Sequence, residues 1–209
     1  MIILLNFAEV ANATANLWSM VYTRWFAEEV FSSSWFVIAG SMILIYTILI
    51  LFIDKSRLRE IFFYGSLLAV AFNFIEMVAT NTGLLAYKTK LFPFISTPFP
   101  FTYTIHPIVH MLAYQYASDW RSFAVINTIT TAFFAFIAQP IYVWAGVLWF
   151  GHWNYIYSFL LAGFSSTMAR VFVLWLASIE QKNATETNRS SLSPKLQPAM
   201  KPLDEDERD

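Results

Sequence analysis

The chain of 209 residues contains no cysteine. This absence excludes disulfide bonds, iron–sulfur clusters and metal sites built from thiolates. Charged residues are also scarce, at 13% of the chain, whereas a typical soluble domain carries about 25%. The net charge of −1 provides no electrostatic basis for binding nucleic acid, so we expect no nucleic-acid partner.

Hydrophobic residues make up 57% of the chain and gather in runs long enough to cross a bilayer. We therefore predict an all-α, polytopic membrane protein with a bundle of five transmembrane helices over residues 33–179. The predicted spans cover residues 35–53, 61–79, 102–117, 123–150 and 155–179. Pro107 lies near the start of the third and shortest span. Gln139-Pro140 predicts a kink in the fourth, because proline has no N–H to donate.

The two ends of the chain differ from the bundle. Residues 1–31 place apolar side chains at spacings near 3.5 residues, with polar side chains between them. This pattern favours an amphipathic helix lying in the membrane interface, with an additional span as the alternative. Residues 181–209 are polar, contain three prolines and end in acidic residues, which predicts a disordered cytoplasmic tail.

Residues 81–101 separate the second and third predicted spans. Asn81-Thr82-Gly83 is a helix-ending sequence, and three prolines further on preclude a regular helix. Irregular backbone cannot face lipid at depth. We therefore predict that this phenylalanine-rich segment is a lid packed against protein at the outer surface.

The basic residues predict the orientation of the bundle. Lys and Arg are enriched in cytoplasmic loops, and residues 54–60 carry three of them, residues 118–122 one, and the tail Lys182 close to the last span. The opposite side carries Arg24, Lys88 and Lys90. We expect a multi-pass protein of the cell membrane with its N-terminus outside and its C-terminus in the cytoplasm.

Glu76 is the only charged residue in the run from 61 to 79. A carboxylate at membrane depth costs roughly 2–3 kcal/mol or more, so it usually faces a protein interior and has a partner. Asn73 shares its helix face at a spacing of three residues. The rise per residue of a helix places Glu76 at the depth of His106 and Asn73 at the depth of His110.

Other polar residues extend this face. Tyr103, His106, His110 and Tyr114 share one side of the third span, and Gln139 lies in the outer half of the fourth. Arg170 lies toward the cytoplasmic side, where it either snorkels to the surface or closes the cluster from below. The candidate residues for a ligand site or proton pathway are Asn73, Glu76, Tyr103, His106, His110, Tyr114, Gln139 and Arg170.

Three interpretations of this set remain open. In the first, the residues hold the helices together by hydrogen bonds. In the second, they form a site for a proton or a polar ligand. In the third, Glu76, His106 and His110 bind a metal ion. Apart from that metal ion, no cofactor is predicted. The favoured function is non-enzymatic: binding of a small polar or lipid ligand, or a proton pathway. The alternative is a membrane-embedded enzyme acting on a lipid or isoprenoid, with the same three residues as acid/base groups or metal ligands.

Several short motifs follow one another along residues 33–178. They are Asn73-x-x-Glu76, Gly83-Leu84-Leu85-Ala86-Tyr87, Leu91-Phe92-Pro93, Tyr114-Gln115-Tyr116, Trp120, Gln139-Pro140 and Trp153. In this order they resemble a family of small multi-pass membrane proteins of endospore-forming Gram-positive bacteria. The resemblance implies a helical integral protein of the cell or spore envelope and supplies no catalytic residues. The chain has Leu85 where the family pattern has a tryptophan.

Overall fold

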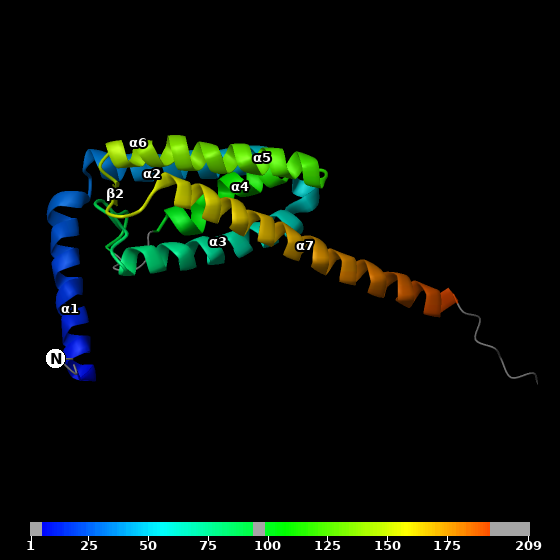
Figure 1. Cartoon of the computed structure of the whole chain (residues 1–209), viewed down its shortest axis with the longest axis horizontal. Coiled ribbons are helices and arrows are strands. Elements are labelled where there is room, and N and C mark those ends of the chain that lie inside the picture. Colours follow the sequence, from blue (N-terminus) through cyan, green and yellow to red (C-terminus); the bar gives the residue numbers. More distant parts are fainter. Residues whose placement is uncertain (1–5, 94–98, 193–209) are drawn as a thin grey trace, which may run out of the picture. The chain divides into compact units, whose positions relative to one another are not determined.

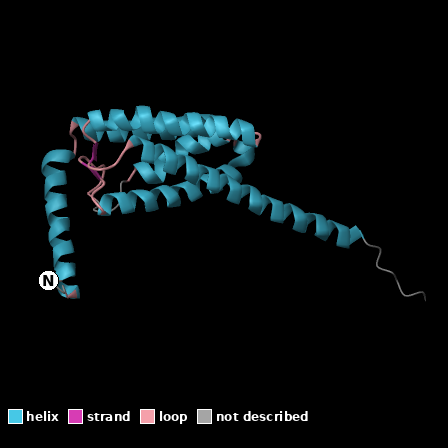
Figure 2. Ribbon diagram, viewed as in Figure 1, coloured by secondary structure: helices cyan, strands magenta, loops and turns pink. Residues whose placement is uncertain are grey.

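The computed structural model describes residues 6–93 and 99–192, and most of these residues are helical (Figure 2). The chain divides into two units, Met1–Val173 and Leu174–Asp209. Every described helix and strand lies in the first unit, except for the C-terminal part of the last helix. The predicted all-α class is confirmed.

Four helical segments are long and apolar enough to cross a membrane. They are formed by α2 (Ser33–Phe52), by η2 (Lys55–Arg57) with α3 (Leu58–Asn81), by α5 (Trp120–Phe133) with η4 (Phe134–Ala138) and α6 (Gln139–Trp144), and by most of α7 (Tyr155–Leu192) (Figure 1). Large apolar side chains on them are exposed, including Val70 at 72% and Leu51 at 69%. Four such helices fit a membrane location.

The predicted third span, residues 102–117, is wrong as a helix of full membrane length. The segment forms a π-helical turn η3 (Phe101–Ile105) and the short helix α4 (His106–Tyr114). Together they rise roughly 21 Å, whereas a bilayer core is roughly 30 Å thick. Most of their side chains are buried. A helix that is surrounded by protein and does not face lipid has no need to match the bilayer.

The segment formed by η3 and α4 nevertheless connects the two ends of the bundle. At one end, the backbone N–H of Asp54 donates to Gln115 Oε1 (2.9 Å) and Arg57 Nη1 donates to the Gln115 carbonyl (3.2 Å). At the other end, the ring of Phe101 packs edge-on against Tyr142 with centroids 4.7 Å apart. We call the first end the basic end, since residues 54–60 and 115–122 lie there.

The opposite end carries two short strands, and we call it the strand end. Strand β1 (Leu85–Tyr87) pairs antiparallel with β2 (Leu148–Phe150), and Tyr87 lies opposite Leu148 (Figure 2). The sequence analysis expected an irregular lid at the first segment and helix at the second. The prediction that the fourth span continues to residue 150 is wrong, because α6 ends at Trp144.

A glycine ends each helix that leads into a strand. Gly83 and Gly146 both have φ of 72°, a conformation that glycine adopts without a steric penalty. The N–H of Leu84 donates to Ala79 O, and the N–H of Val147 donates to Tyr142 O, each at 2.9 Å. These are the hydrogen bonds of a Schellman motif, which stops a helix and turns the chain.

The described part of the segment that follows β1 contacts other parts of the bundle. The N–H of Lys88 donates to Val147 O (2.8 Å), and the indole N–H of Trp35 donates to Leu91 O (3.2 Å). Residues 94–98 lie outside the described residues.

Both terminal segments contain helix. The N-terminal segment forms α1 (Phe7–Arg24), which begins with a capping box between Asn6 and Glu9 and has no buried residue, followed by the π turn η1 (Trp25–Glu29). Its position in a membrane interface stays a prediction. At the other terminus α7 continues to Leu192, so the predicted disorder is wrong for residues 181–192, where no proline interrupts the helix before Pro194. Residues 193–209 lie outside the described residues.

Candidate functional site

Two residues of the site occupy the same local structure on different helices. His106 follows the π turn η3 and precedes Pro107; Gln139 follows the π turn η4 and precedes Pro140. The N–H of His106 donates to Phe101 O, and that of Gln139 donates to Phe134 O. Because proline has no N–H, the ordinary helical pattern cannot continue through it, and such π turns occur frequently at functional sites.

Aromatic rings hold His106 from both sides. Its imidazole stacks on Phe72 of α3, with centroids 3.9 Å apart, and on Phe134 of η4, with centroids 3.8 Å apart. The residue is only 9% exposed, and its Nε2 has no hydrogen-bond partner among the described residues. The stacking fixes the ring plane and leaves one nitrogen available at the edge.

His110 lies one turn further along α4 and is 2% exposed. Its Nδ1 is 3.0 Å from the carbonyl oxygen of His106. A carbonyl only accepts hydrogen bonds, so this nitrogen carries the proton. In the neutral ring Nε2 is then an acceptor, and it has no partner among the described residues.

The carboxylate of Glu76 accepts a hydrogen bond from the Tyr87 hydroxyl at 3.1 Å. This donor comes from strand β1 and not from the third helix, where the sequence analysis sought a partner for Glu76. No ion pair to Glu76 occurs within the described residues.

Two small cavities lie beside these side chains. Glu76, His106 and Gln139 line both of them. The first also contacts Tyr87 and Thr102, and extends toward the two strands; the second extends toward Trp153 and Ser158. The space in each is about that of one or two water molecules. A carboxylate, an imidazole and an amide from three different helices therefore face water-sized space.

Several buried polar atoms near this point have no hydrogen-bond partner among the described residues. They are Asn73 Oδ1, Thr102 Oγ1, His106 Nε2, His110 Nε2 and Gln139 Oε1. Buried polar atoms are almost always hydrogen-bonded. The gathering of such atoms on α3, η3, α4 and α6 therefore marks a polar site and not an ordinary apolar core.

Three of the predicted site residues lie elsewhere. Tyr103 is 43% exposed, and its ring packs near Phe99. Tyr114 donates from its hydroxyl to Glu60 Oε1 (2.7 Å) at the basic end of the bundle. Arg170 belongs to the group at the basic end, because its guanidinium lies 5.6 Å from the Tyr114 ring centroid.

Arg170 does not snorkel to the surface. It is 4% exposed and donates from Nη1 to the Ala117 carbonyl at 3.3 Å. The rings of Trp120 and Phe123 lie within 5.1 Å and 4.6 Å of its guanidinium, so cation–π contacts replace part of its hydration.

No three His, Cys, Asp or Glu side chains are placed to hold a metal ion in the described part of the chain. The predicted metal set of Glu76, His106 and His110 thus gains no geometric support.

Thr102 and Tyr87 also line the first cavity and were not among the residues predicted for the site. A tyrosine in a lid gives no signal of its own, because only the pairing of β1 with β2 brings it to Glu76.

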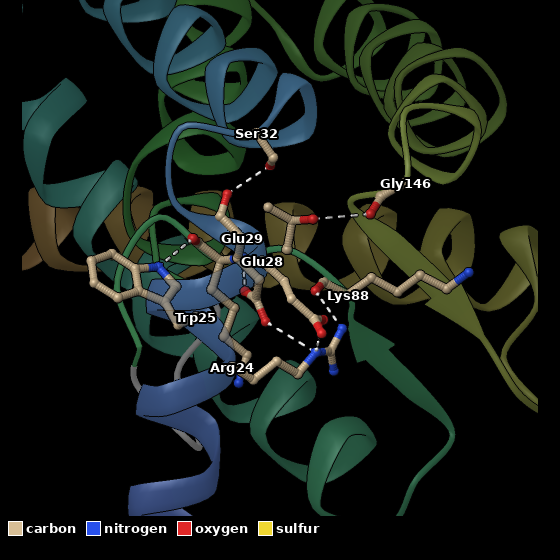
Figure 3. Close-up of polar contacts among 9 residues, drawn as sticks. Arg24, Trp25, Glu28, Glu29, Ser32, Lys88 and Gly146 are labelled. Carbon is tan, nitrogen blue, oxygen red and sulfur yellow. Dashed lines mark hydrogen bonds and ion pairs between the residues drawn. The ribbon is translucent and has the colours of Figure 1, made fainter.

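A buried carboxylate lies near the strand end. Glu29 is 6% exposed and accepts a hydrogen bond from the backbone N–H of Lys90 at 2.9 Å. Figure 3 shows it with Arg24, whose Nε lies 3.7 Å from Glu29 Oε1. Burial raises the pKa of Glu29, although the Lys90 N–H and Arg24 oppose the shift. Burial likewise lowers the pKa of Lys90, opposed by Glu29.

No family model, curated protein or solved structure matches the chain. The resemblance to membrane proteins of endospore-forming bacteria therefore stays a prediction.

Proposed function

We propose that the protein crosses the membrane five times, with α4 as a central crossing shielded from lipid by the four longer helices. Gln115 makes its contacts at the basic end and Phe101 at the strand end, so the segment that contains α4 runs from one end of the bundle to the other. The basic residues then favour the basic end in the cytoplasm. In this arrangement α1 and the two strands are outside, α1 lies in the interface, and the C-terminus is cytoplasmic.

We propose that the bundle passes protons across the membrane by way of Glu76, and that it is not an enzyme. The observation that carries this proposal is the set of three side chains, Glu76, His106 and Gln139, that line the same two water-sized cavities. The first two are side chains that can gain and lose a proton, and Gln139 Oε1 is a hydrogen-bond acceptor without a partner among the described residues.

The environment of Glu76 supports proton handling. An ionised carboxylate at this depth is costly without a cationic partner, and the described residues form no ion pair with it. Protonation removes that cost. Because His106 lines the same cavities, one or two water molecules suffice to relay a proton between the two groups.

The size of the cavities separates this proposal from the enzyme alternative. A lipid or isoprenoid substrate needs a binding site far larger than the space of one or two water molecules. The acid/base roles predicted for Glu76 and His106 on such a substrate are therefore not supported by the space beside them, and His110 lines neither cavity.

The proposal is tested in proteoliposomes that contain a pH-sensitive dye, under an imposed pH gradient. We expect the wild-type protein to dissipate the gradient faster than protein-free vesicles. Glu76→Gln should reduce the rate to that of protein-free vesicles while melting normally, since glutamine still accepts the Tyr87 hydrogen bond. Glu28→Gln is the matched control, because the Glu28 side chain is 70% exposed.

A wild-type rate equal to that of protein-free vesicles would contradict proton passage. An unchanged rate in Glu76→Gln would also contradict it, by showing that protons pass elsewhere.

A further inference from the structure

We propose that Tyr87 positions the Glu76 carboxylate and that the N-terminal helix, through a clamp at Glu29, positions Tyr87. The inference rests on the site of the proposed function and adds its regulation: a displacement of α1 would alter the hydrogen bond that Glu76 receives.

Tyr87 is suited to position Glu76 because two contacts restrain its side chain. Its hydroxyl donates to Glu76 Oε2 at 3.1 Å, and its ring packs against Phe101 with centroids 5.5 Å apart. It lines the same cavity as Glu76, His106 and Tyr142. These are the titratable groups that face Glu76 across that cavity. Because Tyr87 is the last residue of β1, the following residues determine where its hydroxyl lies.

The clamp acts on those following residues. The Trp25 indole N–H donates to Lys90 O (3.0 Å), and Arg24 Nη2 donates to Lys88 O (3.2 Å). The Lys90 N–H in turn donates to Glu29 Oε2 (2.9 Å). Figure 3 shows these contacts converging from the end of α1 and from η1 onto the segment that leaves β1. We call these three hydrogen bonds the Glu29 clamp.

Lys88 connects the clamp to the strand pair. Its carbonyl accepts the bond from Arg24, while its own N–H donates to Val147 O at 2.8 Å. One peptide segment is thus held by the N-terminal helix on one side and by the chain entering β2 on the other. A shift of α1 would be transmitted over a single residue to Tyr87, through bonded and hydrogen-bonded contacts.

The clamp uses the buried carboxylate and not its neighbour. Glu28 also contacts Arg24, at 3.4 Å, but its side chain is 70% exposed. The side chain of Glu29 is only 7% exposed and faces the Lys90 backbone. These adjacent residues provide a matched pair for a test, since they have the same charge and share one cationic partner.

The test reads the hydrogen bond at Glu76 directly, by infrared spectroscopy of the full-length protein in lipid. The carboxyl C=O band of protonated Glu76 is assigned by its loss in Glu76→Gln. Tyr87→Phe should move this band to higher wavenumber, because the carboxyl loses its donor. The same change at the exposed Tyr103 (Tyr103→Phe) should leave the band in place.

The clamp variants then test the coupling. Glu29→Ala should move the band in the same direction as Tyr87→Phe. Glu28→Ala should move it less, because Glu28 reaches the clamp only through Arg24. The double variant Glu29→Ala/Tyr87→Phe should show the shift of Tyr87→Phe alone, because both act through one hydrogen bond. Trp25→Phe keeps an aromatic ring and removes one donor of the clamp. It replaces Glu29→Ala in this test if Glu29→Ala does not fold.

An unmoved band in Tyr87→Phe would overturn the positioning role. Equal effects of the Glu28 and Glu29 variants, an unmoved band in both Glu29→Ala and Trp25→Phe, or additive shifts in the double variant would overturn the coupling. This readout needs no proton flux. A coupled band in a protein that conducts no protons would therefore disprove the proposed function and retain this inference.

Discussion

The carboxylates of Glu76 and Glu29 are held in different ways. Glu76 receives a side-chain hydroxyl from a strand, whereas Glu29 receives a backbone N–H and lies near Arg24. Neither has the paired geometry of Arg57 and Glu60, whose Nη2 and Oε1 are 2.7 Å apart. Among the described residues, Glu76 and Glu29 therefore lack a close ionic partner of the kind that Glu60 has.

Glu29 makes a prediction about pH. Its pKa is raised in the folded protein by burial, so the folded state binds the proton more tightly than the unfolded state. The contribution of Glu29 to the free energy of unfolding is therefore complete below about pH 4.5, near the pKa of an unfolded glutamate. It is lost as the pH rises from there through the pKa of Glu29 in the folded protein. We expect Glu29→Gln to gain stability relative to wild type as the pH rises from about 4.5.

Hydrogen exchange of the Lys90 amide, which donates to Glu29, measures this locally. The Glu28→Gln variant should keep most of the wild-type pH dependence, because the charge of Glu28 is the smallest of the causes that shift the pKa of Glu29. A stability difference between wild type and Glu29→Gln that does not vary with pH would show that Glu29 has the same pKa in both states.

At the scale of elements, α4 organises the bundle by being short and buried. It packs closely on α3, where an added Cβ at Gly65 would lie 2.6 Å from Met111 Cγ. Small residues permit such approaches between helices in membranes. The two proline-linked π turns, η3 and η4, then bring His106 and Gln139 to the cavities beside Glu76.

The close approach predicts the effect of an added methyl group. Gly65→Ala should destabilise the bundle by about 1–3 kcal/mol, because Met111 must move from a packed position. Gly40→Ala is the control, since no atom lies within 4 Å of an added Cβ there. It should be neutral or stabilise α2 by up to about 1 kcal/mol. Unfolding in detergent measures both, and equal stability of the two variants would exclude the packing of α3 on α4.

At the scale of the whole molecule, the number of crossings determines on which side each loop lies. With α4 as a crossing, the turn after it shares a side with residues 54–60. Without that crossing, the same turn would share a side with the end of α3. The hydrogen bonds from Asp54 and Arg57 to Gln115 favour five crossings.

Cysteine labelling tests this arrangement, because the chain has no native cysteine to react. With an impermeant thiol reagent on intact cells, Thr82→Cys and His152→Cys should be labelled, and Ser56→Cys and Ser118→Cys should not. All four positions are exposed. If only Ser56→Cys and Ser118→Cys were labelled, the orientation in the membrane would be the reverse of the proposed one. Identical behaviour of Thr82→Cys and Ser118→Cys would exclude α4 as a crossing.

The sequence by itself determined the class of this protein and the approximate position of its long helices. Apolar runs of membrane length are a local property, so α2, α3 and the start of α7 were predicted within a few residues. The helix end before Gly83 was also predictable, because glycine there adopts a positive φ. The rise per residue of a helix predicted that Glu76 and His106 lie at the same depth in the membrane, and the two side chains line the same cavities.

Only the tertiary structure decided which helix lies in the centre and what contacts Glu76. A run of residues such as 102–117 has the same apolar character whether it faces lipid or other helices, so its burial cannot be read locally. Strands of three residues such as β1 carry too little pattern to be recognised, and their pairing alone brings Tyr87 to Glu76. Arg170 likewise joined the aromatic rings at the basic end because packing, and not its own sequence neighbours, determined its partners.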